Sequence, residues 1–151
     1  MRAVAASRRL KPGESTGTMT AIVGWPKRLV GSSGARLANA LTAFRGGERL
    51  ADYHKRLLPT YDVFDEDRYF EPGDQAVVIE VAGKRVGLAV CEDLWKGLDA
   101  GFGDRYRRGA DPIAELSGLG VELVVAPSAS PFVLGKAAVH REILIQHAKR
   151  Q

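Results

Sequence analysis

The sequence AVVIEVAGKRVGLAVCEDLW, residues 76–95, indicates the β-structure around which this chain is built. It begins with an apolar run, 76–81, and a short Ala-Gly-Lys turn separates this run from a second one that ends at Cys91. Two apolar runs rich in β-branched residues and joined by a glycine-containing turn are typical of a β-hairpin. The sequence therefore predicts two antiparallel strands, with the cysteine at the end of the second.

Helices and a further strand are predicted after this hairpin. Asp111 precedes Pro112, and this pair is typical of a helix start, so we expect a helix over 111–119. The apolar run 121–126 predicts a buried strand, and 136–149 predicts a terminal helix. The apolar face of that last helix contains Val139, Ile143, Leu144 and His147. This order of elements indicates an α/β protein with a mixed sheet.

The first half of the chain predicts another hairpin and a long loop. Residues 20–25 are apolar, and we expect a buried strand that ends at Pro26. Residues 37–44 and a second run that ends near Lys55 flank an Arg-Gly-Gly-Glu turn, which predicts a hairpin. Residues 55–73 have no clean period and are rich in aromatic and carboxylate side chains. Their length exceeds that of an ordinary connection, which favours a functional loop.

Composition excludes several classes of function. A chain of 151 residues with 45% hydrophobic and 26% charged residues is typical of one soluble domain. Its net charge of +4 is modest, and its aromatic residues do not alternate with basic ones, so we expect no nucleic-acid partner. No apolar run approaches the ~20 residues that span a bilayer, so we expect no membrane partner. The single cysteine excludes an internal disulfide and a multi-cysteine metal site, which favours a cytoplasmic protein without a metal.

Cys91 is a candidate nucleophile because it lies at the end of a predicted strand, where α/β sheets present reactive groups. A lone cysteine is more often a small buried hydrophobe. Here, however, Glu92 and Asp93 follow directly, and two carboxylates disfavour a thiolate unless a cation lies nearby. A nucleophilic Cys91 therefore requires a basic side chain close in space.

Lys55 is the best candidate for that cation, because it ends a predicted strand and opens the long loop. A solvated surface lysine is the alternative. Histidine is the usual partner of a catalytic cysteine, but His54 would point to the opposite side of its strand from Lys55. His140 and His147 lie on the predicted terminal helix, where packing explains His147 more simply than catalysis does. A Cys–His dyad stays open as the alternative to a Cys–Lys pair.

Three segments, in order, carry a resemblance to a known family: YHKRLLPTYDVFDEDRYFEPG (53–73), VCEDLW (90–95) and APSASPF (126–132). They resemble the glutaminase domain of glutamine-dependent NAD synthetases, a branch of the nitrilase or carbon–nitrogen hydrolase superfamily. The resemblance extends from about Ala21 to the end of the chain. It implies a nitrilase-type αββα sandwich with mixed sheets.

The resemblance also implies catalytic roles. Cys91 matches the nucleophile that attacks the side-chain amide of glutamine, which releases ammonia and leaves a thioester for water to hydrolyse. Lys55 matches the lysine that supports the oxyanion and the thiolate, a role for which its positive charge is suited.

Substrate-binding roles follow in the same way. Glu92 and Ser130 match positions that hold the ammonium and backbone groups of glutamine, and Tyr61 matches a wall of the substrate site. Lys136 falls where a basic residue can meet the substrate carboxylate. Ser130 could instead cap a turn.

Glu66 corresponds to the superfamily's second, supporting carboxylate, although it could instead pair with Arg68 on the surface. The family's general-base glutamate, in a Pro-Glu-Leu type motif before the lysine, has no match. Only Glu14 and Glu48 precede Lys55, and neither lies in such a motif. Loss of a general base typically slows a reaction by on the order of 10²- to 10⁴-fold. We therefore expect residues 1–151 to be a partial glutaminase domain, truncated at the N-terminus and C-terminus, with little activity alone.

The remaining expectations concern cofactors and partners. The resemblance implies no cofactor for glutamine hydrolysis, and ATP and Mg²⁺ only for a synthetase domain whose Ser-Gly-Gly loop is not in this sequence. It implies that the synthetase domain, or missing chain segments, are partners, and that the intact protein is a homo-oligomer. Two other functions stay open: a nitrilase-type amidase for another small amide, and a non-catalytic nitrilase-like module.

Overall fold

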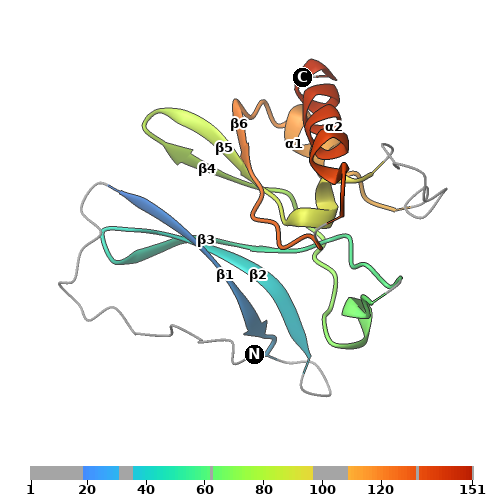
Figure 1. The fold of residues 1–151 in the computed structure, drawn as a ribbon. Helices are drawn as coiled ribbons and strands as arrows, with labels where there is room; N and C mark the ends of the chain where they lie inside the picture. Colours follow the sequence, from blue (N-terminus) through green and yellow to red (C-terminus); the bar gives the residue numbers. More distant parts are fainter. Residues whose placement is uncertain (1–18, 31–35, 62, 97–108, 132, 151) are drawn as a thin grey trace.

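The computed structural model describes residues 19–30, 36–61, 63–96, 109–131 and 133–150. Within these residues the chain forms two three-stranded sheets and two α-helices (Figure 1). The α/β fold class predicted from the sequence is therefore confirmed.

The first sheet is antiparallel and has the order β1-β2-β3. Its strands are β1 (Thr20–Arg28), β2 (Leu37–Arg45) and β3 (Glu48–His54). The predicted hairpin between β2 and β3 is present. Gly46 and Gly47 form its turn with φ values of 59° and 83°, which residues with a β-carbon rarely adopt.

The prediction for β1 was wrong in two respects. The strand does not end at Pro26 but continues to Arg28, because β1 is an edge strand of this three-stranded sheet. Proline is tolerated at such an edge, where its missing N–H group costs no ladder hydrogen bond. The strand is also not buried, since Val23 and Trp25 are exposed.

The second sheet is mixed, as predicted. It consists of β4 (Val77–Val81), β5 (Lys84–Leu88) and β6 (Leu123–Val125), with β4 antiparallel and β6 parallel to β5. The strand predicted to reach Cys91 is shorter, because the chain turns into a 3-10 helix, η2 (Cys91–Leu94). The strand β6 is also shorter than predicted.

The two helices lie beside the second sheet (Figure 1). Helix α1 (Pro112–Gly118) begins at the predicted cap, where the Asp111 side chain accepts a hydrogen bond from the Ala114 N–H at 3.0 Å. Helix α2 (Lys136–Arg150) buries a narrower face than predicted. Its Ile143 and His147 are buried, whereas Val139 and Leu144 are exposed.

Two apolar clusters hold these layers together. The first lies between the sheets and combines Leu41, Ala43 and Tyr53 with Ile79, Val86, Leu88 and Val90. The second joins the opposite face of the second sheet to α1 and contains Ala89, Ile113, Leu116 and Val121. The described residues thus form three layers in succession: the first sheet, the second sheet and the helices. The end of the hairpin β4–β5 therefore lies in the interior.

Candidate active site

Cys91 occupies a strained turn between β5 and η2. Its φ of +43° lies in the left-handed region, which non-glycine residues rarely adopt. Its backbone N–H donates to the Pro127 carbonyl at 3.1 Å, which links this turn to the segment after β6. The half-buried side chain lines a cavity of about 800 Å³. The thiol is therefore placed where a small molecule can reach it.

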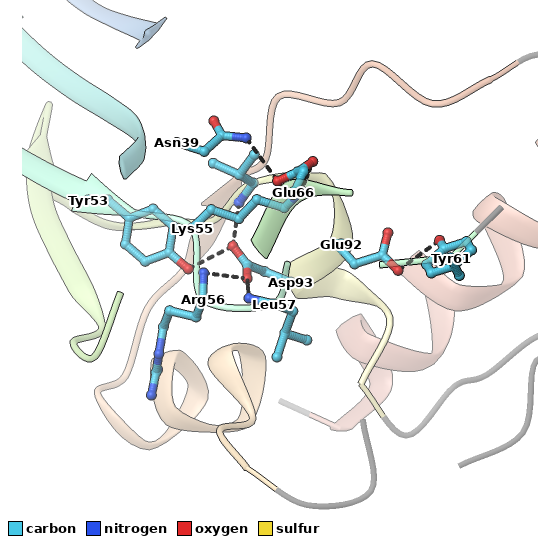
Figure 2. A network of polar contacts seen from close by, with 10 residues as sticks. Asn39, Tyr53, Lys55, Arg56, Leu57, Tyr61, Glu66, Glu92 and Asp93 are labelled. Atoms are coloured by element: carbon cyan, nitrogen blue, oxygen red, sulfur yellow. Dashed lines mark hydrogen bonds and ion pairs between the residues drawn. The ribbon is translucent and has the colours of Figure 1, made fainter. Parts of the chain in front are cut away.

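Lys55 directly follows β3 and is only 2% exposed. Its Nζ donates to Glu66 Oε1 at 2.7 Å (Figure 2). A buried ammonium is costly without such a partner, so this ion pair accounts for the burial of Lys55. Glu66 does not form the alternative pair with Arg68, because Arg68 contacts Asp65 at 3.5 Å instead. The predicted supporting carboxylate thus lies beside the predicted catalytic lysine.

Asn39 and Gly73 hold the lysine and the loop together, and the sequence analysis did not select them as site residues. Asn39 Nδ2 donates to Glu66 Oε2 at 3.3 Å, and the Asn39 carbonyl accepts from the Lys55 N–H at 2.8 Å. The Gly73 N–H donates to the Lys55 carbonyl at 2.9 Å. A β-carbon at Gly73 would clash with the His54 carbonyl oxygen, so this close approach requires glycine.

The predicted substrate-binding residues lie on the walls of the same cavity. Glu92 is 5% exposed, and its Oε1 accepts a hydrogen bond from the Tyr61 hydroxyl at 2.9 Å (Figure 2). Ser130 and Lys136 also line this cavity, from the segment after β6 and the first turn of α2. The cavity therefore collects all seven predicted residues: Lys55, Tyr61, Glu66, Cys91, Glu92, Ser130 and Lys136. Their individual roles remain predictions.

The histidines are placed much as the sequence analysis expected. His54 contacts Lys27, with 3.3 Å between Nε2 and Nζ, and burial and that ammonium lower its pKa. His147 lies on α2 with its Nε2 2.6 Å from the Leu94 carbonyl oxygen, which is a packing role.

His140 packs edge to face against Trp95, with ring centroids 4.9 Å apart. It lines a second cavity of about 260 Å³ together with Cys91. Burial and the charge of Lys136 lower the His140 pKa, and its Nε2 is buried without a hydrogen-bond partner among the described residues. Its Nε2 therefore makes no hydrogen bond to the Cys91 thiol.

Neither glutamate that precedes the lysine is placed as a general base in the described site. Glu48 is exposed at the start of β3 and does not line the cavity, while Glu14 lies outside the described residues. Within the described part of the chain, no group of three or more His, Cys, Asp or Glu side chains could hold a metal ion. None of the helices described there is long and apolar enough to span a membrane.

Comparison with known proteins identifies the family that this chain resembles. A family model described as carbon–nitrogen hydrolase matches residues 14–148. A glutamine-dependent NAD(+) synthetase from Xanthomonas campestris is 38% identical over 137 residues, which cover 89% of this chain and 22% of that relative. The chain therefore spans about a fifth of the length of the curated relatives it matches.

Solved structures give the same result for the fold. The glutamine-dependent NAD+ synthetase of Acinetobacter baumannii, in complex with ADP, superposes with a TM-score of 0.72 at 28% identity, covering 87% of this chain and 22% of that one. An amidase of the nitrilase superfamily from Nesterenkonia AN1 has a TM-score of 0.63 at 20% identity, over 87% of this chain and 43% of the amidase. This second likeness concerns the fold alone.

Proposed function

Because the chain belongs to the carbon–nitrogen hydrolase family, we propose that its cavity binds glutamine and that Cys91 hydrolyses the side-chain amide to release ammonia. The observation that carries this proposal is the placement of Cys91 on one cavity with the buried Lys55–Glu66 pair. The names of the relatives, glutamine-dependent NAD synthetases, support glutamine as the substrate and NAD synthesis as the destination of the ammonia.

Attack by the Cys91 sulfur on the amide carbon places negative charge on the amide oxygen. The Cys91 N–H already donates to the Pro127 carbonyl, and the ammonium of Lys55, which lines the same cavity, supports this charge. The thiol proton leaves with the amide nitrogen as ammonia, and the glutamyl group remains on sulfur as a thioester. Water then attacks the thioester carbon, which yields glutamate and restores the thiol. The ion pair with Glu66 holds the lysine in place throughout.

Recognition of glutamine requires groups for both ends of an amino acid. The Glu92 carboxylate, oriented by Tyr61, is suited to the substrate ammonium. The Lys136 ammonium is suited to the substrate carboxylate, and the Ser130 hydroxyl can bond the backbone groups. A cavity that carries both signs of charge fits a zwitterionic amino acid better than a neutral amide.

This assignment extends to the intact protein. Cysteine and lysine supply the nucleophile and the cation, so the hydrolysis needs no cofactor in this proposal, and ATP and Mg²⁺ serve a synthetase part. That synthetase part is the proposed partner of this chain. Homo-oligomeric assembly and a cytoplasmic location remain predictions.

A chloroketone analogue of glutamine tests the assignment, with intact mass and peptide mapping as the measurement. We expect one covalent adduct on Cys91 and protection by free glutamine. Acetamide at the same concentration should not protect, because it lacks the charged groups that Glu92 and Lys136 recognise. The Tyr61→Phe variant should label at least about tenfold more slowly, since a hydrogen bond to a charged group contributes about 1.5–3 kcal/mol and about 1.4 kcal/mol is a factor of ten.

The matched control is Tyr69→Phe, which removes a hydroxyl from an exposed tyrosine and should label at the wild-type rate. Protection by acetamide and not by glutamine would favour an amidase for another small amide. A folded chain that the analogue does not label would support a non-catalytic module and contradict the proposal.

A further inference from the structure

Asp93 makes four polar contacts near the cavity, although it does not line the cavity itself. It is 0% exposed. Its Oδ1 accepts hydrogen bonds from the N–H groups of Arg56, at 3.1 Å, and Leu57, at 2.9 Å. Its Oδ2 accepts from the Tyr53 hydroxyl at 2.7 Å (Figure 2). It also accepts from the Val90 N–H at 2.8 Å.

These four contacts connect the two halves of the candidate active site. Arg56 directly follows Lys55, and Val90 directly precedes Cys91. One carboxylate therefore joins the residue after the lysine to the residue before the cysteine. The backbone hydrogen bonds of Lys55 to Gly73 and of Cys91 to Pro127 tie each residue to another segment, not to each other.

The contacts define the charge state that Asp93 needs. Burial raises the pKa of Asp93, and the hydrogen bonds from Tyr53, Leu57, Val90 and Arg56 oppose that rise. Three of these donors are backbone N–H groups, which cannot accept a hydrogen bond from a protonated carboxyl group. Burial and the nearby Asp93 also raise the pKa of Tyr53, so its hydroxyl stays protonated and continues to donate. The geometry is that of a carboxylate whose lone pairs are all engaged, which fixes its position.

We propose that Asp93 is a positioning residue, which sets the thiol of Cys91 against the ammonium of Lys55 by holding both backbone segments on one carboxylate. The inference rests on the proposed function for the roles of Cys91 and Lys55, and it adds the residue that holds them together. Asp93 does not touch the substrate in this account.

The proposal predicts that loss of the Asp93 charge slows alkylation of Cys91, whereas a simple charge effect would speed it. If Asp93 acted only as a negative charge near the thiol, its neutralisation would favour the thiolate and speed alkylation of Cys91. If Asp93 positions Lys55, its loss moves the cation away, and alkylation slows. Replacement of Asp93 by Asn also turns one acceptor oxygen into a donor NH₂ group, which faces N–H or O–H donors on either side.

The test measures the second-order rate of Cys91 alkylation by iodoacetamide in the full 151-residue chain, by intact mass, between pH 6 and pH 9. We expect Asp93→Asn to lower the rate at pH 7.5 by about tenfold and to move the half-maximal rate to higher pH. In a Lys55→Met background the same substitution should change the rate by less than about twofold, since the two residues act as one unit. Asp67→Asn, at an exposed position, is the matched control and should leave the rate unchanged.

Two results would overturn the proposal. Faster alkylation of Asp93→Asn would mean that Asp93 acts only through its charge. Equal slowing with and without Lys55 would mean that Asp93 has only a general packing role. Circular dichroism checks folding, and if Asp93→Asn does not fold, Tyr53→Phe replaces it. That variant removes one of four donors, and we expect about a twofold to threefold slowing that disappears in the Lys55→Met background. The readout needs no glutamine, so a chain that alkylates as predicted but binds no glutamine analogue would contradict the proposed substrate and leave this inference intact.

Discussion

The backbone of Cys91 has a φ of +43°, a conformation that costs a residue with a β-carbon about 1 kcal/mol or more. With this backbone conformation the chain turns from β5 into η2, and the thiol reaches the cavity. The neighbouring Glu92 and Asp93 are both buried. Glu92 accepts a hydrogen bond from the Tyr61 hydroxyl, and Asp93 accepts one from the Tyr53 hydroxyl. The two acidic residues beside the thiol thus have separate structural partners.

The strain at Cys91 predicts an inverted order of stability between two variants. Cys91→Gly should be more stable than Cys91→Ala by about 1 kcal/mol, because glycine adopts positive φ without a steric cost. At Ser128, which has no positive φ, the order should be the usual one, with Ser128→Ala at least as stable as Ser128→Gly. Urea unfolding of the four variants measures this difference. Equal stability of Cys91→Gly and Cys91→Ala would mean that the turn is not strained.

At the level of elements, the catalytic side chains come from two connections, Lys55 and Glu66 from the one between β3 and β4 and Cys91 from the one after β5. Lys55 follows β3, Glu66 lies in the 3-10 helix η1 (Glu66–Arg68), and Cys91 follows β5. The loop 55–73 returns to its own start through Gly73, which is why its length does not carry Glu66 away from Lys55.

Local signals in the sequence predicted much of this arrangement. The Gly-Gly turn, the Ala-Gly-Lys turn and the Asp-Pro helix start each have a steric or hydrogen-bonding cause within a few residues, so they could be recognised. The edge position of β1, which tolerates Pro26, depends on strand order and had no local signal. Asn39 and Asp93 were missed as site residues for the same reason, because each acts on residues far along the chain.

A polar cluster on the first sheet joins its three strands on the face opposite Lys55. Asp52 on β3 accepts from Lys27 on β1 at 2.7 Å and from Thr42 on β2 at 2.6 Å. Burial alone would raise the Asp52 pKa, but the hydrogen bonds from Lys27 and Thr42 and the charges of Lys27 and Arg49 outweigh it, so the pKa is lowered. Side chains of β1 and β3 meet over the central strand β2, which leaves room only for small residues such as Ala38 and Ala40.

This cluster predicts a specific pH dependence of the free energy of unfolding. A carboxyl with a lowered pKa in the folded state stabilises the protein above its unfolded pKa of about 3.9, and that contribution is lost as the pH falls through the folded value. The stability difference between wild type and Asp52→Asn should be constant above about pH 5 and shrink below about pH 4. Urea unfolding across this range measures it, with the exposed Glu80→Gln as the control. A difference that does not change with pH would contradict the assignment.

On the scale of the whole molecule, the site lies where the two sheets and α2 approach one another. The inter-sheet cluster around Leu41 and Leu88 fixes the first sheet against the second, which brings Lys55 and Cys91 to one cavity. The segment after β6 and the start of α2 add Ser130 and Lys136. The fold thus brings site residues that are up to 81 positions apart in the sequence, from Lys55 to Lys136, together on one cavity.

The most direct test of the central claim is capture of the acyl-enzyme. The chain is incubated with glutamine for hours, because little activity is expected of this chain alone, and is then quenched in acid and mapped by mass spectrometry for a γ-glutamyl group. We predict one such group on Cys91, none in Cys91→Ala, and a strongly reduced yield in Lys55→Met. A folded chain on which glutamine leaves no acyl group, at concentrations that protect Cys91 from the chloroketone, would contradict Cys91 as the nucleophile for this amide.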